Sequence, residues 1–193
     1  MDKQYCTVED IENYLGIDVA LEFQSQIDGW IEAMSNLVSL RTNREWLVDT
    51  TATDRYFDGN GCQNMEVGDF VGVPTVSIGD SFGENMEVES DFVTFPHNTT
   101  VKNTIILKSG IFSKKIKNVL INVKWGYANS VPEDIKQATV ILTSGIILAQ
   151  TNQDGEIESE KIGNYSVKYV TESQKSDYNQ ALDIINSRKV IRI

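Results

Sequence analysis

The sequence predicts an α+β protein, in which a helical bundle of about four helices carries a small antiparallel β-module between its second and third helices. Apolar residues recur at helical spacing in the first and last parts of the chain, whereas between about Thr53 and Tyr127 the apolar period falls to two. Glycine and proline gather in that central stretch, as turns between short strands require. We therefore expect a helical connector domain over residues 1–52 and 128–193 and an inserted β-module over residues 53–127.

The first predicted helix runs from Thr7 to Leu15. Thr7 is a suitable N-cap, and Asp10 follows three residues later, as in a capping box. Gly16 is well placed to end the helix. A second, longer helix is predicted from about Val19 to Arg41, with Asp18 as its cap. Its apolar stripe comprises Ile27, Trp30, Ile31, Met34, Leu37 and Val38.

The central region predicts five or six short strands that form a small sheet or barrel. The segment Asp58–Gly61 contains two dipeptides that favour tight hairpins. From Val119 to Tyr127, apolar residues alternate with others, which is typical of a half-buried strand. Met86–Glu89 alternates in the same way, and Ile105–Leu107 is a further candidate strand.

A third helix is predicted from Ser130 to about Gln150. Ser130 and Glu133 can form a capping box, and Pro132 falls in the first turn, where its missing N–H is tolerated. The middle of this segment is apolar almost all round, so the helix should be buried on every side. It is either the central helix of the chain or a helix covered by a second subunit. For the second case we expect these subunit-interface residues: Ile141, Ile147 and Leu148.

The last part of the chain begins with a predicted acidic loop over Gln153–Glu160. A short strand within Ile162–Val170 and a final helix over Ser173–Ser187 follow. Beyond them, basic and β-branched residues alternate from Arg188 to Ile193. In one interpretation, these basic residues complement the dipole of the final helix and the chain beyond them frays. In the other, the alternating segment adds to the surface or sheet of a partner.

The net charge of the chain is −11, with an isoelectric point near 4.5. This charge argues against ordinary nucleic-acid binding, which depends on lysine and arginine that neutralise phosphates. The negative charge either keeps the protein soluble or suits the wall of a channel that DNA slides past without being held. The sequence has neither an apolar run long enough for a membrane span nor a signal-peptide pattern at its start, so we expect a protein made in the cytosol.

The sequence predicts no catalytic, metal or cofactor site. Its two cysteines, Cys6 and Cys62, lack zinc-site spacing, and its one histidine, His97, lies in a predicted loop. Phosphate-cradling and metalloprotease motifs are absent from the sequence. Two runs of carboxylates, at 84–91 and 154–160, are typical of solvated faces, although paired carboxylates can also hydrolyse glycosides.

Three stretches, taken in order, resemble one family. They are Thr7–Gly16, Gly126–Ala138 with its Val-Pro-Glu-Asp helix start, and Glu158–Val167 ahead of the last helix. Together they resemble the head-tail connector proteins of the tailed-bacteriophage neck, also known as adaptor or head-completion proteins. The β-module is a departure, because compact members of the family join the second and third helices with much less chain.

The resemblance implies a structural virion protein that is not an enzyme. It implies a ring, typically a dodecamer, that binds the portal protein, extends the DNA channel and meets a downstream neck (stopper) or tail protein. DNA passes through the ring without specific binding, and no membrane is involved. The expected location is the head-tail junction of the virion, and the host cytoplasm during assembly.

Two sets of residues follow as expectations from the resemblance and from their charge. The portal-binding segment is expected to be Arg188, Lys189, Val190, Ile191, Arg192 and Ile193. A channel-facing acidic loop, which repels phosphates at about one Debye length, is expected to contain Asp154, Glu156, Glu158 and Glu160.

Two alternative functions remain open at the level of sequence. The β-module could bind a receptor or carbohydrate, which would make the chain a tail or baseplate component, or the carboxylates could serve an acidic hydrolase. The tryptophans Trp30, Trp46 and Trp125 offer little for sugar stacking, because two of them lie in predicted core stripes.

Overall fold

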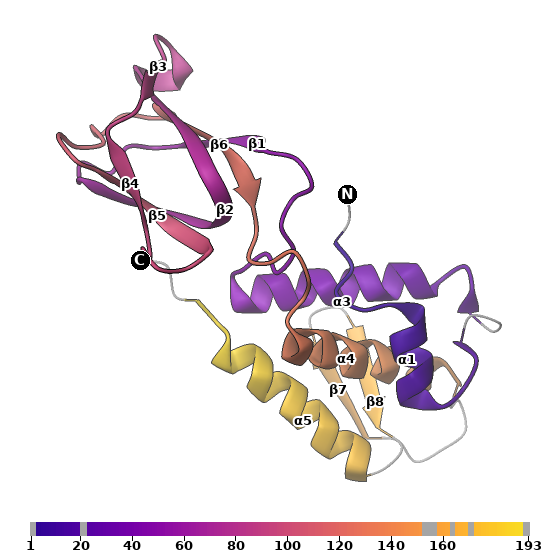
Figure 1. The fold of residues 1–193 in the computed structure, drawn as a ribbon. Coiled ribbons are helices and arrows are strands. Elements are labelled where there is room, and N and C mark those ends of the chain that lie inside the picture. Colours follow the sequence, from indigo (N-terminus) through magenta and orange to yellow (C-terminus); the bar gives the residue numbers. More distant parts are fainter. Residues whose placement is uncertain (1–2, 20–22, 152–157, 163–164, 170–171, 191–193) are drawn as a thin grey trace. The chain divides into compact units, whose positions relative to one another are not determined.

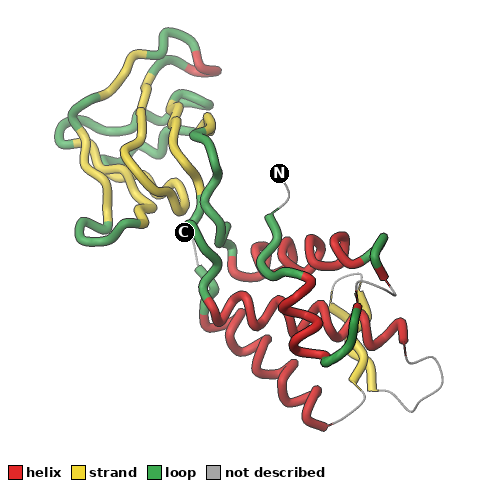
Figure 2. Tube along the Cα trace, turned by 45° about the vertical axis from the view of Figure 1, so that its right-hand side comes forward, coloured by secondary structure: helices red, strands yellow, loops and turns green. Residues whose placement is uncertain are grey.

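The computed structural model describes residues 3–19, 23–151, 158–162, 165–169 and 172–190. The chain forms two compact units, each described here by itself. The helical unit is built from residues of 1–43 and 131–190, and the β-unit is built from residues 44–130. Helices dominate one unit and strands the other (Figure 2), so the predicted α+β class is confirmed.

Helix α1 (Val8–Leu15) begins and ends as predicted. The backbone N–H of Asp10 donates to Oγ1 of Thr7 at 3.2 Å, and the N–H of Thr7 donates to Oδ2 of Asp10 at 2.9 Å, which completes the capping box. Gly16 has a φ of +70°, and its N–H donates to the Glu12 carbonyl oxygen at 2.7 Å. A left-handed residue at this position favours glycine and ends the helix.

Helix α3 (Ile27–Thr42) is shorter than predicted. A continuous helix from Val19 is wrong, because residues 24–26 form a turn; residues 20–22 are outside the described part. In this turn the N–H of Gln26 donates to the Phe23 carbonyl oxygen at 2.8 Å, and the Phe23 ring packs 5.4 Å from the Trp30 ring. The predicted core face is present, with these fully covered apolar residues: Ile27, Ile31, Met34 and Val38.

Helix α4 (Glu133–Thr151) is the central helix of its unit. It packs against α1, α3, strand β8 (Tyr165–Tyr169) and α5 (Glu172–Ser187), as Figure 1 shows. An element with neighbours on several sides needs an apolar surface on several sides, which explains the composition of this helix.

A two-stranded antiparallel hairpin, β7 (Glu158–Ile162) with β8, completes the helical unit. The expected acidic loop over Gln153–Glu160 is therefore wrong for its last three residues, which belong to β7. Their backbone pairs with β8, with Glu158 opposite Tyr169 and Glu160 opposite Val167. Charged residues are compatible with a strand when its partner supplies the backbone hydrogen bonds.

The β-unit contains a six-stranded antiparallel sheet in the order β1-β6-β2-β5-β4, with β3 also paired to β2. The strands are β1 (Thr53–Phe57), β2 (Asn64–Ile78), β3 (Glu87–Glu89), β4 (Phe92–Phe95), β5 (Val101–Leu107) and β6 (Val119–Trp125). The long strand β2 changes partner along its length, and its register shifts between Glu66 and Phe70 and again between Val71 and Thr75. Gly68 and Gly72, both with φ of +94°, fall within these two shifts, where a bulge needs a left-handed residue.

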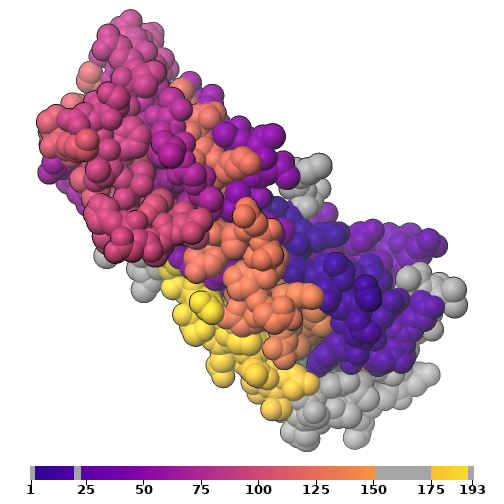
Figure 3. Space-filling view, in the orientation of Figure 1, coloured from indigo at the N-terminus to yellow at the C-terminus, as the bar shows by residue number. Residues whose placement is uncertain are grey.

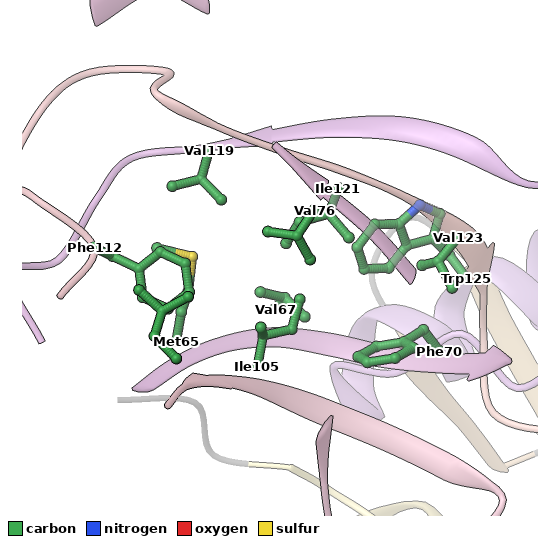
Figure 4. Close-up of a cluster of buried hydrophobic side chains, with 11 residues drawn as sticks. Met65, Val67, Phe70, Val76, Ile105, Phe112, Val119, Ile121, Val123 and Trp125 are labelled. Carbon is green, nitrogen blue, oxygen red and sulfur yellow. The ribbon is translucent and has the colours of Figure 1, made fainter. Parts of the chain in front are cut away.

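The core of the β-unit is built from alternate residues of its strands (Figure 4). In β6 the predicted alternation is confirmed, because Val119, Ile121, Val123 and Trp125 are all buried. The remaining members of this core are Met65, Val67, Phe70, Val76, Ile105, Leu107 and Phe112.

The expected tight hairpin at Asp58–Gly61 is wrong, because β1 and β2 on either side of it do not pair with each other. The segment instead binds the loop before β6. The N–H of Gly59 donates to the Lys115 carbonyl oxygen at 3.0 Å, and the N–H of Gly61 donates to the Phe112 carbonyl oxygen at 2.7 Å. A Cβ at Gly59 would lie only 1.8 Å from the Ser113 carbonyl oxygen, so this approach needs glycine.

Candidate interaction surfaces

The segment that follows α5 is fixed to the helical unit through residue 190. The Arg188 guanidinium pairs with Oδ2 of Asp134, at 2.8 Å from Nε and 2.7 Å from Nη2. The N–H of Val190 donates to the Thr42 carbonyl oxygen at 2.9 Å. Lys189 is exposed. In the expected portal-binding segment, Arg188 and Val190 therefore already have partners within the chain, whereas Ile191, Arg192 and Ile193 lie outside the described residues.

Two of the three expected interface residues of α4 are covered within the chain. Ile141 is 5% exposed and Ile147 is fully buried, so neither side chain offers surface to a second subunit. The packing of α4 against α1, α3, α5 and β8 supplies the cover that the sequence left open. Leu148 is only partly buried. Helix α5, drawn in yellow in Figure 3, lies at the surface of the helical unit.

The expected channel-facing residues fall in two places. Asp154 and Glu156 lie outside the described residues, whereas Glu158 and Glu160 belong to the backbone of β7. The structure thus places two of the four carboxylate-bearing residues in a hairpin strand.

At the base of the β-unit, the two segments that lead to the helical unit are joined to each other. The N–H of Tyr127 donates to the Glu45 carbonyl oxygen at 2.8 Å, and the N–H of Val48 donates to the Ala128 carbonyl oxygen at 2.9 Å. Gly126 has a φ of +125°, and a Cβ there would lie 2.2 Å from the Leu47 carbonyl oxygen, so only glycine fits between the segments.

Arg44 connects these two segments with strand β2. Its Nε lies 2.6 Å from Oδ2 of the buried Asp69 on β2. Its guanidinium also lies over the rings of Tyr127, at 4.5 Å, and Trp46, at 5.3 Å from the centroids. A planar cation between two rings and a carboxylate is a role for which arginine is suited. Sequence reasoning did not find this cluster, because its members are far apart along the chain.

A second group links α1 to α4. Oδ1 of Asp10 lies 2.6 Å from Nζ of Lys136. Partial burial acts to raise the pKa of Asp10, but hydrogen bonds from Lys136 and Thr7 outweigh it and hold the pKa below its usual 3.8. Nearby, burial and the charge of Asp10 raise the pKa of the Cys6 thiol to about 12, so this thiol stays protonated.

Exposed apolar side chains gather on the β-unit beside a basic loop. They are Tyr56, Phe82, Val88 and Ile116. The run Lys114-Lys115-Ile116-Lys117 is the sequence signal that could have drawn attention to this surface, because it is basic and apolar within an acidic chain.

The described residues show no arrangement typical of catalysis or metal binding. No group of three or more His, Cys, Asp or Glu side chains within the described part could hold a metal ion. His97 is exposed, and its ring packs 5.5 Å from that of Phe95. Among the helices described, none combines the length and apolar character needed to cross a membrane.

No protein-family model matches the sequence, and no curated protein matches it either. Solved structures do match the fold. A chain from the neck of an empty gene transfer agent (GTA) particle with C6 symmetry aligns with a TM-score of 0.62 and 13% identity, over 96% of this chain and 90% of the other. A chain from the virion of a native GTA particle has a TM-score of 0.59 and 11% identity, over 96% and 89%.

A chain from the neck of a native GTA particle with C12 symmetry aligns with a TM-score of 0.53 and 13% identity, over 100% of this chain and 97% of the other. Coverage this high requires that both the helical unit and the β-unit contribute to the likeness. The chain therefore shares the fold of chains found in the necks of GTA particles, and the β-unit is part of that fold.

Proposed function

We propose that this chain is a non-enzymatic structural subunit of a phage-like neck. Copies form a ring that binds the portal protein on one side and the next neck or tail protein on the other, and DNA passes through the ring. The observation that carries the proposal is the likeness to chains of GTA necks, which spans both units and nearly the whole length of each chain.

The charge of the chain supports the same proposal. A net charge of −11 disfavours retention of DNA, because a passing phosphate backbone is repelled by an acidic wall and not held by it. The symmetry of the particles named above, C6 and C12, suits a subunit that repeats around an axis.

The β-unit gives little support to the alternative of carbohydrate binding. In the β-unit, Trp46 and Trp125 are fully buried, and the third tryptophan, Trp30, belongs to the helical unit and is partly buried. Their rings are therefore not a platform on which a sugar can stack. The exposed aromatic side chains of the β-unit are those of Tyr56, Phe82 and Phe95.

The direct test is assembly of the purified full-length chain. We expect negative-stain electron microscopy and mass photometry to show rings, either of the chain alone or after mixing with the portal protein of the same genome. Ring and portal should co-migrate on a density gradient. A chain that stays monomeric at every concentration and never co-migrates with portal would rule the proposal out.

A further inference from the structure

The segment Asp58–Gly61 contains the only Asn-Gly dipeptide of the sequence. Asparagine loses its side-chain amide most readily when glycine follows it, because no Cβ shields the glycine nitrogen from the asparagine side chain. That nitrogen attacks the side-chain carbonyl carbon and closes a five-membered ring. The two reacting atoms here are the backbone nitrogen of Gly61 and Cγ of Asn60.

The reaction at this pair is a deamidation in two steps. In the first step the Gly61 nitrogen loses its proton and bonds to Cγ of Asn60, and the side-chain nitrogen leaves as ammonia. The product is a cyclic succinimide. In the second step water opens the ring at one of its two carbonyls and leaves either aspartate or isoaspartate at position 60. Water is the co-reactant, and nothing is oxidised or reduced.

In the structure both reactive groups are engaged in hydrogen bonds. The N–H of Gly61 donates to the Phe112 carbonyl oxygen at 2.7 Å. The side-chain amide of Asn60 is held at both ends, because Oδ1 accepts from the N–H of Cys62 at 2.9 Å and Nδ2 donates to the Asn64 carbonyl oxygen at 2.8 Å. Ring closure requires the amide and the Gly61 peptide to rotate toward each other, and these bonds oppose that rotation.

Further bonds join the same segment to a loop that is distant in the sequence. The N–H of Lys117 donates to Oδ1 of Asp58 at 2.7 Å. The N–H of Gly59 donates to Oδ1 of Asn118 at 2.8 Å. Because Asn118 is fully buried, the loop that holds the segment is itself fixed within the β-unit.

Residues 58–62 and residues 112–118 together form what we name the loop clamp. One end of it is anchored in the core, because the N–H of Phe112 donates to the Cys62 carbonyl oxygen at 2.8 Å and the Phe112 ring is fully buried (Figure 4). Segments joined by several backbone bonds open by local unfolding. The population of the open clamp therefore determines how often Asn60 can react.

We propose that Asn60 is a deamidation site that the closed loop clamp keeps unreactive and that opening of the clamp exposes to modification. The modification also prevents the clamp from closing again. Isoaspartate adds one methylene to the main chain after position 60, so the bonds on the two sides of this position no longer fit the opposite loop together. The site acts within a single chain and is independent of the proposed ring.

The first test compares the full-length chain when folded and when unfolded in guanidinium chloride, at the same mildly basic pH. Peptide mass spectrometry follows the change from amide to acid at position 60. We expect the folded chain to react at least about tenfold more slowly, because only its open fraction reacts. Asn60→Gln, whose longer side chain closes a ring far more slowly, identifies the signal. Equal rates in the two samples would overturn the proposal.

The variant Asp58→Ala weakens the clamp in the folded chain. It removes the acceptor of the Lys117 N–H, and it also removes an Asp-Gly pair that could form a succinimide in the same way. We expect deamidation at Asn60 to be about fivefold faster than in wild type, as the loss of one hydrogen bond predicts. The matched control is Asp54→Ala, which removes an exposed carboxylate that accepts from Nδ2 of Asn122 outside the clamp. The control should react at the wild-type rate.

A measurement on the wild-type chain provides the same test without a substitution. Amide hydrogen exchange at Gly61 requires the same break with the Phe112 carbonyl oxygen. Below the unfolding transition, added urea should change exchange at Gly61 and deamidation at Asn60 by the same factor. Deamidation that rises while Gly61 stays protected would overturn the proposal. A folded Asp58→Ala chain that reacts no faster than the control would do the same, and if that variant does not fold, the exchange measurement decides.

Discussion

Arg44 is the residue on which the base of the β-unit depends. Its cation pairs with Asp69, whose side chain is 5% exposed, and it lies over the rings of Tyr127 and Trp46. These contacts connect both segments that lead to the helical unit with strand β2. A buried carboxylate is tolerated only while its partner is present, because an unpaired buried charge is costly.

We predict that Arg44→Met destabilises the β-unit by about 3 kcal/mol, because it leaves Asp69 buried without its cation. The double variant Arg44→Met/Asp69→Leu should be less destabilised than the single variant, since it removes both charges together. Urea denaturation followed by tryptophan fluorescence measures both, because Trp46 and Trp125 lie in this unit. Equal stability of wild type and Arg44→Met would show that the pair contributes nothing.

At the scale of elements, patterns within one segment predicted what that segment does. The ends of α1 followed from Thr7, Asp10 and Gly16, which act through bonds to residues three or four positions away. The burial of alternate residues in β6 followed from its period of two. Local pattern was insufficient where the partner is distant. Asp58–Gly61 has the composition of a hairpin, yet it binds the loop at 112–118, which no local rule reveals.

The same limit applies to the expected interaction sites. The apolar surface around α4 is equally consistent with a central helix and with a subunit interface. In the structure α1, α3, α5 and β8 pack around α4, so it is the central helix of its unit. The exposed apolar side chains of the β-unit at Tyr56, Phe82, Val88 and Ile116 escaped sequence reasoning because they come from four separate segments. Lys114–Lys117 alone is a short charge run, and such runs are usually solvated.

The contact between α1 and α4 predicts a dependence of stability on pH. Because the pKa of Asp10 is held below its usual 3.8 in the folded chain, its ion pair with Lys136 stabilises the fold above that pH. This contribution is lost as the pH falls through the folded-state pKa. We therefore expect Asp10→Asn to be less stable than wild type at neutral pH, and the difference to shrink as the pH falls below 3.8 and through the lower folded-state pKa of Asp10.

Urea denaturation of the two proteins across this pH range measures the difference, with helical circular dichroism as the signal. Asp28→Asn is a suitable control, because Asp28 is an exposed carboxylate of α3. A difference between Asp10→Asn and wild type that does not change with pH would contradict a role for the charge.

At the scale of the whole molecule, the chain combines a helical unit, a β-unit and an excess of negative charge. In the proposed ring each weak contact is repeated once per subunit. Repetition turns a contact that is hard to detect between two single chains into a stable joint between two rings. This argument applies most directly to the proposed portal contact of the residues after Val190.

We predict that deletion of residues 191–193 leaves folding and ring assembly intact and abolishes attachment to the portal. Folding should be unaffected, because the last described anchors, Arg188 with Asp134 and Val190 with Thr42, remain.

Each isoleucine that is covered by the partner contributes about 1.5–3 kcal/mol. Ordering the backbone costs about 1–2 kcal/mol per residue, so one segment alone binds weakly and the ring binds firmly. The loss should therefore be large for rings on portal-bearing heads and too small to measure for single chains. Arg41→Ala, which removes an exposed cation of α3 and keeps residues 188–193, is the matched control and should still attach. Truncated rings that sediment with portal-bearing heads as well as wild-type rings do would exclude these residues from the joint.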